Sequence, residues 1–264
     1  MAGVKAKREQ AAIDLLLTYG IAFVIVAAVV SILYILLLQV PSSIPSNCVF
    51  EIGISCSIIS IGSNASGTSI ILIASNQETY PIFSPTAEVE LGGAQYSFAC
   101  IPSLVIQGGT IACNTTVSKT FSEGTLESGT INVAATPCLG ANSTQCTLQK
   151  QNFTGTFSTH IQPFEKISYG INVSAENSTV STDTDDKIFA HVTIEVNRVL
   201  YPFVGVTVNF ILNSTGASFN KTNSITSEGG IALTGLTSSS TGNYIVKAKF
   251  GNIKSANVTI TFKK

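Results

Sequence analysis

Few side chains in this sequence have the chemistry for catalysis or metal binding, and they are unevenly placed. Six cysteines lie between residues 48 and 146, two histidines lie far apart, and three aspartates gather at residues 183–186. None of the GxSxG, HExxH, P-loop or GxGxxG motifs occurs in the chain. We therefore expect no enzyme activity, no catalytic residue and no cofactor.

The cysteines have the even number and the local spacing that favour disulfides in an oxidising compartment. A zinc or iron–sulfur site is the alternative, but it requires closer ligand pairs than these cysteines provide, and His160 is the single histidine of the segment. We expect no metal site. Sequence alone leaves the pairing open, and short loops favour these candidates: Cys48 with Cys56, Cys100 with Cys113, and Cys138 with Cys146.

Asp183, Asp185 and Asp186 stand between two expected strands. Carboxylate oxygens are ligands for calcium, but the segment lacks the loop register and the distal glutamate of an EF-hand. A solvated turn is the preferred interpretation. His160 and His191 are expected on strand surfaces rather than in a shared metal centre.

Asparagine, serine and threonine account for 77 of the 264 residues, whereas only 11% are charged. Chance would place about four N-x-S/T sequons in such a chain. The sequence has nine, so we expect some to be glycosylated if the host carries out this modification. The candidates are Asn64, Asn114, Asn142, Asn152, Asn172, Asn177, Asn213, Asn220 and Asn257.

A long apolar helix is the element that must position the remaining candidate, Asp14. Residues 11–38 contain no proline and one charged side chain, Asp14, and Pro41 ends the run. Such a helix is about 42 Å long, more than the roughly 30 Å hydrocarbon core of a bilayer. Its length is about twice that of the apolar part of a secretory signal, so we expect it to be retained.

The distribution of positive charge predicts the orientation of this helix. Lys5, Lys7 and Arg8 precede it, and the next Lys or Arg is Lys119. The positive-inside rule therefore places the N-terminus in the cytoplasm and the chain beyond Pro41 outside.

The run KAKREQAAIDLLLTYG at residues 5–20 resembles the class III signal peptide of archaeal type IV pilin-like proteins. In that family a basic leader is followed by glutamine as the first mature residue and a carboxylate at the fifth. The resemblance implies a leader at 1–9, cleavage between Glu9 and Gln10 by a prepilin peptidase, and Asp14 as the assembly carboxylate. The family carries glycine where this sequence has Glu9, so an uncleaved, permanently anchored relative is the alternative.

The resemblance also implies a use for the helix at 10–40. It first holds the protein in the cell membrane and then packs against identical or related pilin subunits in a filament core. A carboxylate there needs a partner, and the new N-terminus of a neighbouring subunit supplies one. A plain membrane anchor, with a tolerant Asp14, is the alternative.

The chain beyond residue 41 is expected to be all β. Short β-branched or alternating runs bounded by glycine and polar residues are typical of strands, and Gly92-Gly93, Gly108-Gly109 and Glu123-Gly124 supply turns. We expect a disulfide-stapled β domain at 41–166, in which the apolar run Thr68–Asn76 is a buried strand. Its strands are expected at Ser57–Ile61, Ser69–Ala74, Ala87–Leu91, Tyr96–Ile101, Ser103–Ile106, Thr110–Thr116, Gly129–Ala134 and Gly155–His160.

A second β domain is expected at 167–264, where seven short strands fit an immunoglobulin-like (Ig-like) sandwich. The segments PFVGVTVNF (202–210), TSEGGIALT (226–234) and TGNYIVKA (241–248) resemble invasin/intimin-type bacterial Ig-like domains. That resemblance implies a spacer or adhesive module on a cell surface. The strands are expected at Tyr169–Ala175, Lys187–Glu195, Val204–Leu212, Ser218–Asn220, Ile231–Leu233, Gly242–Phe250 and Ser255–Phe262.

These observations predict a structural subunit of an archaeal type IV pilus-like filament on the cell surface. Its outward β domains would serve adhesion or contact with a surface receptor or partner cell. The alternatives are a membrane-anchored adhesin or envelope protein that does not polymerise, and a minor or tip pilin. A net charge of −1 gives no electrostatic basis for binding nucleic acid.

Overall fold

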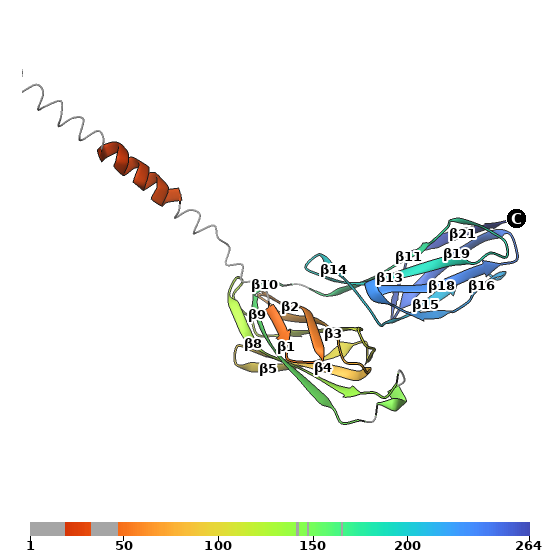
Figure 1. The fold of residues 1–264 in the computed structure, drawn as a ribbon, viewed down its shortest axis with the longest axis horizontal. Helices are drawn as coiled ribbons and strands as arrows, with labels where there is room; N and C mark the ends of the chain where they lie inside the picture. Colours follow the sequence, from red (N-terminus) through yellow and green to blue (C-terminus); the bar gives the residue numbers. More distant parts are fainter. Residues whose placement is uncertain (1–18, 33–46, 141–142, 147, 165) are drawn as a thin grey trace, which may run out of the picture. The chain divides into compact units, whose positions relative to one another are not determined.

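The computed structural model describes residues 19–32, 47–140, 143–146, 148–164 and 166–264 (Figure 1). The chain divides into two compact units, Met1–Pro45 and Ser46–Lys264. The second unit contains all three disulfides and both hydrophobic cores. It therefore has the internal contacts of an independently folding region, which we call the β region.

The first unit is described at residues 19–32, which form an α-helix. Valine, isoleucine and alanine dominate this stretch, and the single serine, Ser31, donates its hydroxyl hydrogen to the carbonyl of Ala27 at 2.7 Å. No helix within the described residues combines the length and hydropathy needed to cross a bilayer. The remaining parts of the helix expected at 10–40 lie outside the described residues.

The first half of the β region is a ten-stranded sheet with the order β1-β9-β8-β4-β5-β7-β3-β2-β10, in which β6 also pairs with β4. The pairs are antiparallel except that β10 runs parallel to β2. The strands are β1 (Asn47–Phe50), β2 (Ile54–Asn64), β3 (Gly67–Asn76), β4 (Ile82–Leu91), β5 (Ala94–Ile101), β6 (Leu104–Val105), β7 (Thr110–Val117), β8 (Leu126–Pro137), β9 (Gln151–His160) and β10 (Gln162–Pro163).

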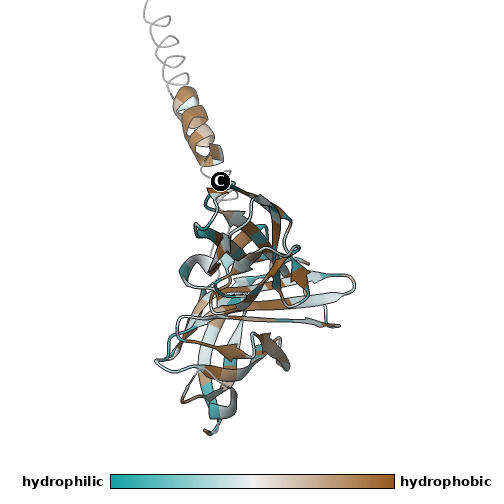
Figure 2. Ribbon diagram, turned by 90° about the vertical axis from the view of Figure 1, so that its right-hand side faces the viewer, coloured by the Kyte–Doolittle hydropathy of each residue, from teal (hydrophilic) through white to brown (hydrophobic). Residues whose placement is uncertain are grey.

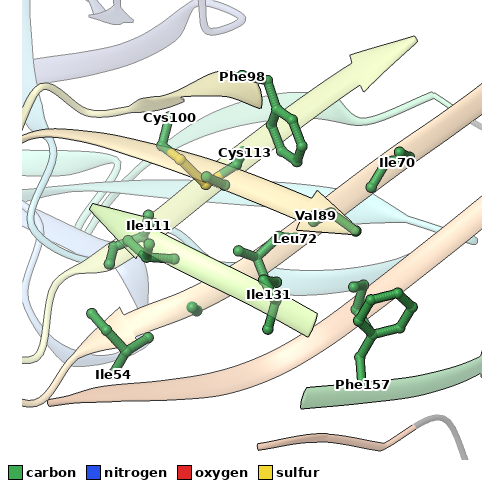
Figure 3. Packing of buried hydrophobic residues seen from close by; sticks show 14 of the residues in the cluster. Ile54, Ile70, Leu72, Val89, Phe98, Cys100, Ile111, Cys113, Ile131 and Phe157 are labelled. Atoms are coloured by element: carbon green, nitrogen blue, oxygen red, sulfur yellow. A yellow bond between two sulfur atoms is a disulfide. The ribbon is translucent and has the colours of Figure 1, made fainter. Parts of the chain in front are cut away.

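This sheet folds over on itself into two layers, and β5 is the strand that passes from one layer to the other. Its residues 94–99 pair with β4, whereas Cys100 and Ile101 pair with β7. Side chains from both layers of the folded sheet meet in one core, among them Leu72 of β3, Val89 of β4 and Ile131 of β8, all fully buried. Figure 3 shows these side chains close to the Cys100–Cys113 disulfide.

Strand β3 explains the apolar run at Thr68–Asn76, which the structure confirms as a buried strand. Ile70 and Leu72 face the core of the folded sheet, whereas Ile71 and Ile73 belong to the core of the second half of the β region. A strand that is buried on both faces loses the usual alternation of apolar and polar residues. The run is apolar because both faces of the strand are buried, each in a different core.

The second half of the β region is a sandwich of two sheets, with the orders β11-β13-β18-β16 and β12-β21-β19-β15-β17; β14 also pairs with β13, and β20 with β19. A 3₁₀ turn at Glu228–Gly230 precedes β18. The strands are β11 (Ser168–Ala175), β12 (Thr179–Ser181), β13 (Asp186–Val196), β14 (Val199–Pro202), β15 (Thr207–Leu212), β16 (Ala217–Phe219), β17 (Asn223–Ile225), β18 (Ile231–Ser238), β19 (Gly242–Phe250), β20 (Ile253–Lys254) and β21 (Val258–Lys263).

This strand order is that of an Ig-like sandwich. With β11, β13, β16 and β18 taken as strands A, B, D and E, and β15, β19 and β21 as C, F and G, the sheets read ABED and CFG. Tyr244, near the start of β19, donates its hydroxyl hydrogen to the carbonyl of Ser240 at 3.4 Å, as in the tyrosine corner of Ig domains. The topology thus confirms the Ig-like prediction for this part of the chain.

The structure corrects the expected starts of two strands. The strand expected from Ser255 begins at Val258 as β21. Val204 was expected to begin the strand that leads to Leu212, but β15 begins at Thr207. Gly205 has a φ of +83°, in the left-handed region that favours glycine. Residues 203–206 therefore turn instead of extending β15.

Candidate functional site

The helix at residues 19–32 is the first candidate functional element because it exposes apolar side chains along its whole described length. Every described residue of the helix is exposed, including Tyr19, Phe23 and Val26 at 70%, 74% and 60%. Figure 2 colours the helix mostly brown, and it contains no charged residue. A helix that is apolar on all sides is stable only in lipid or in a packed helical core.

The residues that the sequence assigns to leader, processing and assembly lie outside the described residues. They are Lys5, Lys7, Arg8, Glu9, Gln10 and Asp14. Cleavage between Glu9 and Gln10, and pairing of Asp14 with a neighbouring subunit, therefore stay predictions.

The disulfides form the second candidate element, and they join the cysteines in the three local pairs that the spacing favours. Cys48–Cys56 connects β1 to β2, which lie near opposite ends of the strand order. Cys100–Cys113 connects β5 to β7 at the point where the sheet folds over. Cys138–Cys146 closes the segment that follows β8. Two of the three bonds thus hold together the two places where the folded sheet would otherwise open.

A third element connects the two halves of the β region. We call it the joint: the loop 106–110 and the loop 202–206. The backbone amide of Thr110 donates to the carbonyl of Val204 at 2.9 Å, and the amide of Val204 donates to the hydroxyl of Thr110 at 3.1 Å. A Cβ on Gly205 would lie 3.1 Å from Cγ1 of Ile106 and 3.2 Å from Cα of Gly109. The glycines therefore allow two backbones to approach closely.

Two buried polar side chains shape the loops of the joint, and sequence reasoning did not identify either. Asn76, fully buried, donates its side-chain amide to the carbonyls of Tyr80, Val105 and Ile106 at 3.0–3.3 Å. Thr226, 1% exposed, donates to the carbonyl of Phe203 at 2.6 Å and accepts from the amide of Val206 at 3.0 Å. The sequence signal for Asn76 was its position at the end of the doubly buried strand.

Aromatic packing extends the joint into the Ig-like half. The ring of Phe203 stacks on Tyr169 at a centroid distance of 5.8 Å and meets Phe250 edge-on at 5.3 Å. Burial raises the pKa of Tyr169 to about 12, because the charged phenolate is disfavoured away from water. Tyr169 follows the connection between the two halves, so this packing fixes the start of the second half.

The acidic cluster separates into residues with different surroundings. Asp183 and Asp185 are exposed, and Asp183 has a φ of +64° in a turn. Asp186 is 1% exposed, and its Oδ1 accepts from the backbone amide and the side-chain amide of Asn177 at 3.1 and 3.2 Å. Burial is the main cause that raises the pKa of its carboxyl above the usual value. Within the described residues no group of three or more His, Cys, Asp or Glu side chains has the arrangement of a metal site.

The two histidines lie on separate strands, His160 half-buried at the end of β9 and His191 exposed on β13. Their strands belong to the two different halves of the β region, so the fold does not bring them together.

Comparisons with protein-family models and with curated proteins give no match. Among solved structures, the D0–D1 domain of intimin is 16% identical, with a TM-score of 0.29, over 79% of this chain and 99% of that one. Invasin, a bacterial integrin-binding protein, is 15% identical with a TM-score of 0.32, over 80% and 39%. A glycosyl hydrolase family 2 member from Bacteroides cellulosilyticus is 14% identical with a TM-score of 0.31, over 77% and 24%. TM-scores this low establish neither a common fold nor a common function.

Proposed function

We propose that this protein is a membrane-anchored cell-surface protein whose β region projects outward for adhesion or surface contact. The observation that carries the proposal is the helix at 19–32, which is apolar on every side and exposed throughout. Burying its side chains requires lipid or other helices. The β region needs neither, because it encloses its own cores.

The disulfides support an outer location for the β region. All six cysteines are paired, as expected in an oxidising environment and not in the cytosol. The basic residues before the helix favour the same orientation. Both arguments support an outer location for residues 47–264.

The surface of the β region has the character of a contact module that does not rely on charge. One ion pair occurs among the described residues, between Lys187 and Glu176 at 3.5 Å, and both side chains are about half exposed. Contact with a partner would therefore depend on hydroxyl and amide groups and on isolated apolar side chains. The Ig-like half is the proposed adhesive part.

Protease treatment of intact producing cells tests the location. We expect external protease to release fragments of residues 47–264 while the helix stays in the membrane fraction. Complete protection in intact cells, with cleavage only after lysis, would contradict the proposal.

Two exposed leucines allow a matched test of which half makes the contact. Leu233 of the Ig-like half is 44% exposed, and Leu139 of the disulfide half is 78% exposed. We expect Leu233→Asp to weaken attachment of cells to their surface and Leu139→Asp to leave it unchanged, scored as cells retained after washing. The opposite result would assign contact to the disulfide half. Deleting residues 167–264 is a poorer test, because it would uncover Ile71 and Ile73.

A filament subunit of the archaeal type IV pilus-like class is the second candidate, and the basic leader with Gln10 and Asp14 favours it. In this version the helix is first an anchor and then part of a filament core built from related subunits, after cleavage by a prepilin peptidase. The large two-part outer region favours a minor or tip subunit over a bulk subunit. In a filament built mainly from this protein, the outer region of each subunit would have to fit beside that of every neighbouring subunit.

The N-terminal residue of the native protein separates the two candidates. Mass spectrometry of a sheared surface fraction should find Gln10 as the first residue of a filament subunit, and Asp14→Ala should then block assembly while the β region stays folded. An N-terminus at Met1 or Ala2, in membranes only, would leave the anchored protein. Normal filaments with Asp14→Ala would refute the role of the carboxylate.

A further inference from the structure

The described sequons share one property, which is exposure to solvent. Every sequon asparagine in the described part of the chain is exposed, and so is the serine or threonine two residues later. The asparagines that are buried or half-buried, Asn76, Asn132 and Asn197, all lack the sequon. The fold thus presents the asparagine and the hydroxyl residue of every described sequon to solvent. The described sequon asparagines are Asn64, Asn114, Asn152, Asn172, Asn177, Asn213, Asn220 and Asn257; Asn142 lies outside the described residues.

Two of these sequons, at Asn172 and Asn177, lie five residues apart and differ in whether the side-chain nitrogen of the asparagine is hydrogen-bonded. Asn177 uses its side-chain nitrogen, the atom that a glycan would modify, to donate to Asp186 at 3.2 Å. Asp186 is 1% exposed, and its other oxygen has no hydrogen-bond partner among the described residues. A sugar on Asn177 would therefore have to be accommodated next to a buried carboxylate.

Asn172 has the opposite surroundings. It lies on β11, at the end of its sheet, and pairs with His191 of β13. Its side chain makes no hydrogen bond within the described residues, and it borders an open hollow of about 470 Å³ that also includes Ile171 and Leu200. Leu200 is 64% exposed. The hollow has room for sugar rings whose less polar faces would cover Leu200.

We propose that Asn172 carries an N-linked glycan and that Asn177 does not. In the modification, the amide nitrogen of Asn172 bonds to the anomeric carbon of an oligosaccharide carried on a polyprenyl pyrophosphate or phosphate. The bond between that carbon and the phosphate oxygen breaks, the lipid phosphate leaves with the bonding electrons, and a base of the transferase takes the amide proton. This inference rests on the outer location proposed above.

The sequence provides a direct way to separate the two sites. Trypsin cuts after Lys166 and Lys187, and a glutamate-specific protease then cuts after Glu176, between the two asparagines. Mass spectrometry of the native full chain from the membrane or surface fraction should find glycan mass on peptide 167–176. It should find peptide 177–187 unmodified. An unmodified peptide 167–176, or equal modification of both peptides, would overturn the proposal.

Two substitutions at the hydroxyl residue give a matched control that keeps Asn172 itself. Ser174→Ala removes the sequon, and we expect complete loss of the glycan mass from peptide 167–176. Ser174→Thr keeps the sequon, and we expect the mass to remain. Ser174 is exposed, so neither change should affect folding. Protease accessibility in intact cells reports the location separately, so an accessible but unmodified protein would refute only the glycan.

Discussion

The two halves of the β region have cores of similar size but hold their sheets together differently. The disulfide half is one sheet folded over on itself, and Cys48–Cys56 and Cys100–Cys113 hold the places where it would open. The Ig-like half contains no cysteine. It is closed instead by Ig connections and by Tyr244, whose hydroxyl contacts Ser240 and Ser238. Covalent bonds are thus placed where the topology provides no equivalent closure.

Reduction of the disulfides should produce the largest difference between the halves. Each native disulfide is worth about 2–4 kcal/mol of unfolding free energy. We expect the fragment 46–264 in reductant to lose amide protection in β1–β9 while β13 and β19 stay protected, measured by hydrogen exchange. Equal loss of protection in both halves would show that the Ig-like half depends on the folded sheet.

Adjacent isoleucines on β3 give a sharper test, because they face different cores. Ile70 is fully buried in the folded sheet, and Ile71 is 1% exposed in the core of the Ig-like half. Each change to alanine should cost about 2–5 kcal/mol. Hydrogen exchange should place the effect of Ile70→Ala mainly in β4 and β8, and that of Ile71→Ala mainly in β13 and β15. The same pattern for both variants would contradict the double burial of the strand.

The joint should be sensitive at Gly205. Alanine there meets both the left-handed φ of +83° and the close contacts with Ile106 and Gly109, at a cost of about 1–3 kcal/mol. Gly251, with a φ of +56° and open space around it, is the matched control, because alanine there meets only the unfavourable backbone conformation and no close contact. Urea unfolding of both variants should show the larger loss for Gly205→Ala. If Gly205→Ala lowered the free energy of unfolding no more than Gly251→Ala, the two loops of the joint would be able to move apart without loss of stability.

The smallest expected effect is the pH dependence that Asp186 contributes. Because its folded pKa is raised above 3.8, the folded state keeps the proton longer than the unfolded chain. Its contribution to stability therefore falls as pH rises through this range and levels off above the folded pKa. We expect the unfolding free energy of the wild type, relative to Asp186→Asn, to decline as the pH rises above 3.8, the ordinary pKa of the carboxyl, and to level off above the raised folded pKa. A difference that does not change with pH would contradict the raised pKa.

Sequence reasoning located every strand of six or more residues, together with β6 and β16 among the shorter ones. Each expected strand overlaps an observed one, because alternation and β-branched runs record which face is buried. It missed β1, β10, β12, β14, β17 and β20, which have two to four residues each and are too short for a pattern. The division at 166 and 167 stays a prediction, since Ile71 and Ile73 belong to the core of the Ig-like half.

The candidate sites were less predictable than the strands. The glycine pair at 108–109 indicated a turn, but nothing local showed that Gly205, 96 positions after Gly109, would lie against it. Asn76 and Thr226 bind carbonyls of loops whose positions only the fold determines. Similarly, the sequons at Asn172 and Asn177 are equivalent in sequence and become different only through Asp186 and the hollow next to β11.

The position of Cys48 has a mechanical consequence for a tethered protein. A pulling force that arrives from the N-terminal side enters the β region at Asn47, and Cys48 is the second residue of β1. The disulfide passes this load covalently to Cys56 on β2, so the ladder between β1 and β9 can be peeled by only one residue before a covalent bond bears the tension. The residues between the two cysteines are left out of the load path, and the force is delivered to β2, near the opposite end of the strand order from β1.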